Sequence, residues 1–411
     1  MGARPAGAGS RQPDRLWSST PPPLALAGAA MSTETQVNCP QCGSKGVGFD
    51  PTSGELKCRY CGWQKGIPQT EAQVEELAYE SYLQITKDQL VTLSPEALEV
   101  TCTGCGAETE FVPPQVAGDC PFCGTHLSSP AQTASPMLMP NGILPFALDR
   151  NRAYTGMQTW LGRNWFCPND LKKLAQREGM QAVYLPFWTY DAYTVSFYRG
   201  ERGEYYYETE TYYETNEDGE RERKTREVRK TRWYPASGRV SRSFDDVLIP
   251  ASKSVKYDYL KRLEPWHYEG KLKAYEPSYL AGYKVERFQT DLKAGFELAK
   301  EDMERAIRGD VCRDIGGDEQ RIHSLSTEYS SVTFKHLLLP IWIGSYRYRN
   351  KSYQVLVNAR TGEILGDRPL SVWKIALTVL LSALLIGGIV WFIQTQENQP
   401  PPDQPVPVQE P

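Results

Sequence analysis

Residues 39–61, CPQCGSKGVGFDPTSGELKCRYC, and residues 102–123, CTGCGAETEFVPPQVAGDCPFC, decide the fold of the N-terminal part of this chain. Each stretch holds two CxxC pairs, separated by 15 residues in the first stretch and by 14 in the second. This spacing is typical of zinc ribbons, because each CxxC turn presents two sulfurs and the intervening hairpin brings the other two opposite them. The sequence therefore predicts two structural Zn²⁺ ions, one held by Cys39, Cys42, Cys58 and Cys61, the other by Cys102, Cys105, Cys120 and Cys123.

Other roles for these cysteines are less favoured. Four thiolates leave no open coordination position, which argues against a catalytic zinc ion. His126 follows the second quartet, and we expect it to be a surface or packing residue, because four sulfurs already satisfy the ion. No thioredoxin-like βαβ pattern surrounds any pair, so the motifs do not indicate a redox centre.

The composition limits the class of protein. The chain has 411 residues, enough for two or three folded units. Its 46 basic and 50 acidic side chains give a formal net charge of -4, which does not indicate a strongly basic nucleic-acid binder. Only Cys167 and Cys312 lie outside the CxxC pairs, and this pattern favours metal ligation in a reducing compartment over a secreted disulfide framework.

The run IALTVLLSALLIGGIVWFI at 375–393 predicts a transmembrane helix, because 19 uncharged residues at 1.5 Å each span about 30 Å. Trp373, Lys374 and Trp391 lie where interfacial anchors are expected. Basic residues precede the run, and the tail after it carries only acidic charges. The positive-inside rule therefore predicts a single-pass protein of the cytoplasmic (inner) membrane with its N-terminal domains in the cytosol.

The middle of the chain becomes aromatic-rich and strand-like after a Ser/Pro/Met-rich linker. Alternation predicts a strand over 183–197 and a long hairpin over 204–232 that turns at 216–219, with further strands over 333–365. Helical periodicity predicts helices over 151–175, with a break at Pro168 and a second helix capped by Asn169, and over 285–308. The expected fold is therefore small zinc ribbons plus an α+β domain with antiparallel strands, and one C-terminal transmembrane helix.

We expect the following order along the chain. A disordered N-terminal extension over 1–35 contains Met31, a possible alternative start. It is followed by zinc ribbon 1 over 36–66, a helical spacer over 67–95, zinc ribbon 2 over 96–129, a linker over 130–142, the aromatic-rich α+β domain over 143–370, the transmembrane helix over 373–394 and a disordered Pro/Gln-rich tail over 395–411.

Two segments of the α+β domain resemble one another. VYLPFWTYDAY at 183–193 and LLPIWIGSY at 338–346 each contain an apolar entry, a proline, a tryptophan and a tyrosine. This echo predicts a possible internal duplication of one strand–hairpin unit. Pro186 and Pro340 would then lie at strand starts or edges, where a missing N–H is tolerated.

The densest basic run lies on the second arm of the expected hairpin and faces a first arm, EYYYETETYYET at 204–215, that is acidic and Tyr-rich. The favoured interpretation is cross-strand pairing between the two arms. A patch for anionic lipid or nucleic acid is the alternative. The basic residues are Arg221, Arg223, Lys224, Arg226, Arg229, Lys230 and Arg232.

The sequence contains no recognisable catalytic machinery. It has no G-x-x-x-x-G-K-[ST] phosphate loop, no GxGxxG after a strand and no HExxH. Trp266 and His267 are adjacent to each other and could line a pocket, although aromatic packing is the favoured interpretation. We therefore expect no enzymatic activity, no catalytic residues, no small-molecule substrate and no cofactor besides zinc.

The ribbons, the segments ILPFALDRNRA at 143–153, LGRNWFCPNDL at 161–171 and VYLPFWTYDA at 183–192, and the C-terminal anchor together resemble a family. They are similar to bacterial TFIIB-type zinc-ribbon membrane proteins, some of which are encoded beside phage-shock (PspA-like) and SPFH-domain proteins in envelope-stress operons. Relatives often carry the label primosomal protein N′ or superfamily II helicase, although this chain lacks the phosphate-binding loop of a helicase motor.

The resemblance implies a membrane scaffold that docks cytosolic partners of the PspA or SPFH type and acts in envelope stress. Closed metal sites, a membrane anchor and the lack of catalytic motifs favour the same interpretation. A nucleic-acid-binding zinc-ribbon protein is the alternative, with a ribbon and the basic run contacting the phosphate backbone. An enzyme with an unrecognised site in the aromatic domain is a third hypothesis.

Overall fold

The computed structural model describes residues 38–68, 74–84, 98–111, 118–127, 132–133, 137–163, 165–168, 180–215, 219–268, 270–348 and 351–397. The expected disordered extension, the Asn169 helix cap, most of the hairpin turn and the end of the C-terminal tail lie outside these residues.

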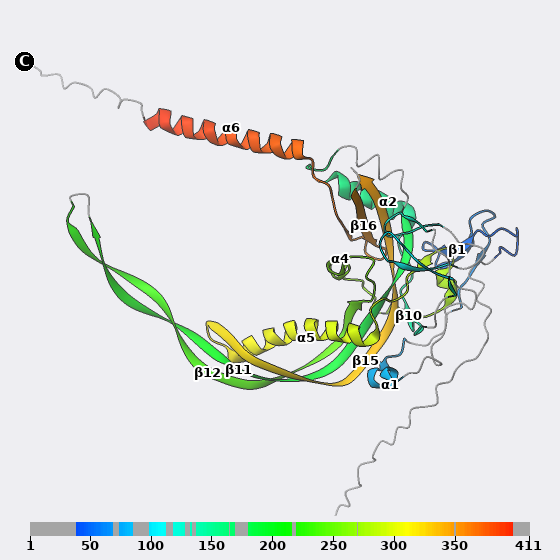
Figure 1. The fold of residues 1–411 in the computed structure, drawn as a ribbon, viewed down its shortest axis with the longest axis horizontal. Coiled ribbons are helices and arrows are strands. Elements are labelled where there is room, and N and C mark those ends of the chain that lie inside the picture. Colours follow the sequence, from blue (N-terminus) through cyan, green and yellow to red (C-terminus); the bar gives the residue numbers. More distant parts are fainter. Residues whose placement is uncertain are drawn as a thin grey trace, which may run out of the picture. The chain divides into compact units, whose positions relative to one another are not determined.

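Three long antiparallel strands form the centre of the fold, as Figure 1 shows. They are β11 (Gln181–Thr215), β12 (Arg221–Pro250) and β15 (Glu319–Tyr348), in the order β12-β11-β15. Their bounds join the predicted strands into continuous elements, and β15 begins 14 residues before the expected position. The predicted sheet-rich domain with antiparallel strands is confirmed.

Short strands pair with successive parts of the outer edge of β15. β4 (Leu77–Ala78), β10 (Gly142–Ile143) and β16 (Lys351–Asn358) cover it in turn. The remaining short strands of this sheet are β13 (Lys273–Ala274), β14 (Lys284–Val285) and β17 (Ile364–Gly366). From Thr333 to Tyr348, the edge of β15 therefore no longer exposes a row of free N–H and C=O groups.

The described part of the expected spacer helix is mostly not helical. Leu77 and Ala78 pair with β15 as β4, and the helix α1 (Tyr79–Leu83) is only five residues long. The apolar residues that suggested a helical period are therefore used in a strand and a single turn, because the edge of β15 takes up their backbone hydrogen bonds.

Two helices with similar N-termini pack on the sheet. In α2 (Arg150–Gly162) the Asp149 side chain accepts a hydrogen bond from the Arg152 N–H, and in α5 (Leu292–Ile315) Asp291 accepts one from the Ala294 N–H. These caps fix both starts. Consequently α5 begins seven residues later than the periodicity predicted, and it continues to Ile315 before Gly316 at a positive φ ends it. The structure also contains α4 (Tyr257–Arg262) and the 3₁₀ helix η2 (Pro277–Leu280).

The two similar segments are direct neighbours related by a local twofold axis. Leu185 pairs with Leu339, so the axis passes through that pair. The Trp188 indole N–H donates to the Thr290 carbonyl before α5, and the Trp342 indole N–H donates to the Leu148 carbonyl before α2, both at 2.9 Å. Recurrence of the tryptophan contact and of the aspartate cap favours an internal duplication of a helix–strand–strand unit.

The two prolines lie inside long strands, not at their starts. The Pro186 carbonyl accepts a hydrogen bond from the Ala251 N–H, and the Pro340 carbonyl accepts one from the Ala359 N–H. The pairing of β11 with β12 begins at Phe187, and that of β15 with β16 begins at Ile341. Each proline therefore faces the point where a neighbouring strand stops pairing, so its missing N–H leaves no ladder bond unmade.

The C-terminal helix α6 (Val372–Glu397) contains a segment, Val372–Ile393, that is long and apolar enough to cross a membrane. Its apolar side chains are exposed on all sides of the helix, since none of that window is buried against the rest of the protein. The predicted run at 375–393 lies within this segment.

Candidate metal centres

Ribbon 1 is a small three-stranded sheet of β1 (Val47–Asp50), β2 (Glu55–Cys58) and β3 (Gln64–Lys65). At each CxxC turn an N–H bonds back to the first cysteine, from Gly43 to the Cys39 carbonyl and from Gly62 to the Cys58 carbonyl. Both glycines have positive φ, which other residues rarely adopt. The small residues that follow the pairs thus close the turns that present the sulfurs.

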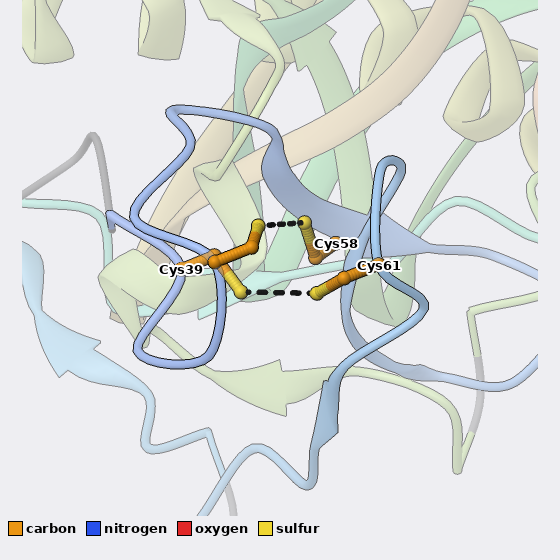
Figure 2. Close-up of side chains that lie close together, drawn as sticks. Cys39, Cys58 and Cys61 are labelled. Atoms are coloured by element: carbon orange, nitrogen blue, oxygen red, sulfur yellow. Dashed lines mark hydrogen bonds between the residues drawn. The ribbon is translucent and has the colours of Figure 1, made fainter.

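The sulfurs of ribbon 1 converge from both turns. Figure 2 shows the side chains of Cys39, Cys58 and Cys61 directed toward one another. Cys39 Sγ lies 3.4 Å from Cys61 Sγ, and Cys42 Sγ lies 3.8 Å from Cys58 Sγ. Four sulfurs at about 2.3 Å from a tetrahedral ion are about 3.8 Å apart, so the spacing of the quartet is close to that of a zinc site.

A hydroxyl group supports each quartet. Ser44 Oγ lies 3.1 Å from Cys42 Sγ and 3.3 Å from Cys58 Sγ in ribbon 1. In ribbon 2, Thr125 Oγ1 lies 3.1 Å from Cys123 Sγ. The sequence analysis missed both residues, although each stands two positions after a CPxC pair, in CPQCGS and CPFCGT. A hydroxyl group beside a ligand sulfur orients that sulfur, and the Ser44 hydroxyl also favours the thiolate form of Cys58, the form that zinc requires.

Each quartet contains a cysteine whose pKa is lowered by its neighbours. The Ser44 hydroxyl and the backbone N–H of Cys61 lower the pKa of Cys58 to about 6. The side chain of Cys105 lowers the pKa of Cys120 to about 5, while the Cys105 pKa rises because that thiol donates to Cys120. A thiolate already stabilised by its neighbours is the species that ligates metal.

Ribbon 2 repeats this geometry with a different set of short strands. It contains β5 (Leu98–Thr101), β6 (Glu108–Phe111), β7 (Gly118–Asp119), β8 (His126–Leu127) and β9 (Gln132–Thr133). Cys102 Sγ lies 3.5 Å from Cys123 Sγ, and Cys105 Sγ lies 3.6 Å from Cys120 Sγ. Both predicted quartets are therefore assembled, and the ligand atoms within each lie within 4.8 Å of one another.

His126 is not part of the second quartet. Its Nδ1 lies 3.1 Å from a carboxylate oxygen of Asp119 on the neighbouring strand, and the side chain is exposed. This agrees with the surface role expected from the sequence. Cys167 and Cys312 likewise lie outside both quartets.

Ribbon 1 docks on the loop around η2. The Phe49 N–H donates to the Ala281 carbonyl, and the Tyr283 hydroxyl donates to the Phe49 carbonyl, both at 3.0 Å. The Phe49 ring also packs edge-on against Tyr279 at 5.4 Å between centroids. The ribbon is therefore joined to this loop by one backbone hydrogen bond, one side-chain hydrogen bond and aromatic packing.

Ribbon 2 docks through a residue inside its metal-binding turn. Phe122, between Cys120 and Cys123, is 0% exposed and lies in the core cluster that also contains residues of β11 and β15. Gln354 on β16 donates to the Phe122 carbonyl, and Gln289 donates to the Gly106 carbonyl at 3.2 Å. The zinc-binding turn itself is thus part of the domain core.

A buried carboxyl group lies beneath ribbon 2. Glu286 is 1% exposed, next to Thr109 of β6, and accepts a hydrogen bond from the Ser254 hydroxyl. Burial raises its pKa to about 8, so the carboxyl group is protonated at neutral pH. We therefore expect this contact between ribbon 2 and the sheet to weaken when the carboxyl group ionises.

A third cluster of acidic side chains surrounds a lysine at a β-bulge. Carboxylate oxygens of Glu76, Asp191 and Asp245 lie within 4.8 Å of one another. Lys335, only 7% exposed, places its ammonium group 2.6 Å from Asp246 and 3.2 Å from Glu76. This lysine supplies the cation that the carboxylates require, so the arrangement is a structural ion-pair network.

Comparison with known proteins identifies one relative of unknown role. The chain is 26% identical over 381 residues to the uncharacterized protein YdjG of Bacillus subtilis (strain 168), covering 85% of this chain and 98% of that protein. No family description matches the sequence. No solved structure matches it at a significant level.

Proposed function

We propose that this protein is a membrane-anchored zinc-ribbon scaffold that recruits protein partners at the cytosolic face of the inner membrane, in an envelope stress response. The apolar segment of α6 supports anchoring, and the charges that flank it favour a cytosolic position for the ribbons and the sheet. The two metal centres are closed four-sulfur sites built into the domain core, as structural zinc requires.

The observation that carries the proposal is the arm formed by β11 and β12. β15 accompanies β11 only as far as the pair Gly203–Glu319, whereas β11 and β12 continue to the pair Thr215–Arg221. Figure 1 shows this two-stranded extension beyond the end of β15. A two-stranded hairpin buries little apolar surface and is only marginally stable by itself. The length of this arm therefore favours a role in contacting another molecule.

The two faces of the arm differ in chemistry. Alternation along β11 places the even-numbered side chains on the side of α5, where the Tyr198 hydroxyl bonds to Asp314 at 2.7 Å. On this face of the arm, basic side chains pair with glutamates of the opposite strand. The pairs are Lys224–Glu214 at 2.8 Å, Arg226–Glu210 at 3.3 Å and Lys230–Glu208 at 2.5 Å. The cross-strand pairing predicted from the sequence is therefore present for three of the seven residues of the basic run.

The other face, which we call the Tyr/Arg face, has a different composition. In the two-stranded part it carries Tyr205, Tyr207 and Tyr213 with threonines, and three arginines against one glutamate: Arg221, Arg223, Arg229 and Glu227. Tyr207 and Tyr213 are 65% and 67% exposed. Tyrosine and arginine are the residues most enriched at the energetic centres of protein interfaces. The excess of arginine favours an acidic partner surface.

A photo-crosslinking experiment in living cells tests the proposal. The probe, p-benzoylphenylalanine, replaces Tyr213 on the Tyr/Arg face or its neighbour Tyr212, which lies on the opposite face. The expected result is a protein adduct at position 213 that is absent at position 212. The adduct should be lost in R221Q/R223Q and retained in K224Q/R226Q, which removes the same charge from the other face.

A second variant tests the role of zinc. Changing Cys39, Cys42, Cys102 and Cys105 to Ser removes half of each quartet, and the scaffold should then lose partners that contact the ribbons. Equal recovery of every partner by this variant and by the parent protein would contradict a zinc-dependent scaffold. Mass spectrometry of the adducts identifies whether PspA-like or SPFH-type proteins are among them.

Binding of nucleic acid is the second candidate, because exposed tyrosines beside arginines can also stack bases and contact phosphates. Binding of a single-stranded oligonucleotide that weakens steeply with salt, and that R221Q/R223Q abolishes, would favour it. No binding at low salt would exclude it.

A further inference from the structure

A short segment far from α6 in the sequence is tied to its first turn. The Lys374 ammonium group donates to the Trp165 carbonyl at 3.0 Å and to the Cys167 carbonyl at 2.8 Å. The Ser371 N–H donates to the Phe166 carbonyl at 2.8 Å. Segment 165–167 therefore lies against the start of α6, and its three backbone carbonyls accept the three hydrogen bonds that hold it there.

The position of Lys374 fixes how close this segment comes to the hydrocarbon. Lys374 is the last charged residue before the apolar run that begins at Ile375. Its side chain contacts the carbonyls of residues 165 and 167 directly, so that backbone lies within one lysine length of the helix segment entering the bilayer. Each headgroup layer is about 5 to 8 Å thick, as the difference between core and total bilayer thickness gives. Segment 165–167 is therefore at headgroup depth if α6 spans the membrane.

The side chains at this site suit that depth. Trp165 is 67% exposed and Trp373 is 79% exposed, an unusual state for two large aromatic side chains. Tryptophan is enriched at membrane–water interfaces, where its ring contacts acyl chains and its N–H remains hydrated. The Lys374 ammonium group lies 5.1 Å from the Trp165 ring, and Arg368 stacks at 3.4 Å on the half-buried ring of Trp160.

We propose that Trp165 is a second membrane anchor, and that segment 165–168 together with residues 368–374 forms a collar that binds the headgroup layer of an anionic bilayer. This inference rests on the proposed anchoring by α6. The occupant is lipid because the collar is continuous with the apolar surface of α6, and because Lys374 beside the exposed Trp165 indole, together with Arg368 in the same collar, complements anionic headgroups. The collar would hold the large sheet at a fixed position relative to the membrane surface, whereas a flexible linker before α6 would allow the sheet to change its orientation.

The test uses the full chain reconstituted in vesicles of phosphatidylethanolamine and phosphatidylglycerol. p-Benzoylphenylalanine replaces Trp165, Trp391 within α6 or Tyr60 on ribbon 1, which is 70% exposed. Position 391 reports insertion of α6, and position 60 reports random collisions with lipid. Since Trp165 and Tyr60 are exposed, the probe at either position leaves the core unchanged, and zinc content verifies folding.

We expect lipid adducts when the probe is at position 391 or 165, and no lipid adduct when it is at position 60. Adducts at 391 without adducts at 165 would overturn the collar and leave the anchored scaffold standing. Absence of adducts at both positions would overturn insertion of α6, and the collar with it. A protein adduct at 165 in cells, in place of lipid, would also overturn the inference and assign the exposed tryptophan to a protein interface.

Discussion

Phe122 and Tyr60 occupy equivalent places in the two ribbons, since each is the second residue between the cysteines of the C-terminal CxxC pair. Their surroundings are opposite. Phe122 is 0% exposed within the domain core, whereas Tyr60 is 70% exposed. Replacing each with alanine leaves all eight cysteines in place, so the comparison separates docking of a ribbon from metal binding. We expect F122A to weaken the docking of ribbon 2 and Y60A to have little effect.

The expected magnitude follows from the burial. Truncating a fully buried phenylalanine to alanine typically costs about 3 to 5 kcal/mol, because transfer free energy is lost and a cavity remains. The hydrogen bond from Gln354 to the Phe122 carbonyl depends on the same docked position. An exposed substitution such as Y60A usually changes stability by about 0.5 kcal/mol or less. Every 1.4 kcal/mol is a factor of ten, so opening of ribbon 2 should become about a hundred to a few thousand times more frequent.

Hydrogen exchange measured by mass spectrometry on the detergent-solubilised full chain reads this opening locally. Peptides covering residues 118–127 and β16 should lose protection in F122A, while those of ribbon 1 should not, because its contacts are with η2 and not with Phe122. Both variants should keep two zinc ions per chain. Exchange in F122A as slow as in Y60A would refute the conclusion that the metal-binding turn is part of the core.

Three further predictions concern single substitutions. Burial raises the Glu286 pKa from the ordinary 4.5 to about 8, so between these pH values the folded state keeps a proton that the unfolded state has released. The free energy of unfolding should therefore fall as pH rises from about 4.5 to 8, by about 1.4 kcal/mol per pH unit at most. Chemical denaturation at pH 5 and pH 8 measures this dependence, and E286Q should flatten it. G200A should be strongly destabilising, since a Cβ there would lie 2.1 Å from the Arg321 carbonyl oxygen of the neighbouring strand, and loss of the folded protein on size exclusion would show it. G309A should raise stability by about 0.5 to 1 kcal/mol in thermal denaturation, because this helical glycine has open space around its Cβ position.

The metal centres could be predicted from the sequence almost completely. Thiolate chemistry and the two-residue spacing of each pair are local properties, so the eight cysteines and their grouping follow without any knowledge of the rest of the fold. The apolar segment of α6 is also a local property and was equally visible. The partners of Phe49 and Phe122 could not be predicted, because they lie about 230 residues away in the sequence.

Element boundaries were less predictable where tertiary contacts compete with local pattern. Leu77 and Ala78 fit a helical period, but the free edge of β15 offers their backbone groups hydrogen bonds and makes them a strand. The start of α5 could be recognised afterwards from Asp291, whose side chain caps the helix, although the apolar periodicity extends further toward the N-terminus. In both places the hydrogen-bonding requirement of the backbone decides the structure.

The basic run of the arm shows why composition alone could not assign its role. In sequence it is one dense basic run interrupted by Glu222 and Glu227, for which pairing with the opposite strand and contact with a ligand are competing explanations. In the hairpin, successive residues of β12 point to opposite faces, so the basic residues are divided between the two faces of the arm. Lys224, Arg226 and Lys230 are neutralised by glutamates. Arg221 and Arg223 lie with exposed tyrosines on the other face. The two explanations therefore apply to different residues, and only the second set is expected to respond when a partner binds.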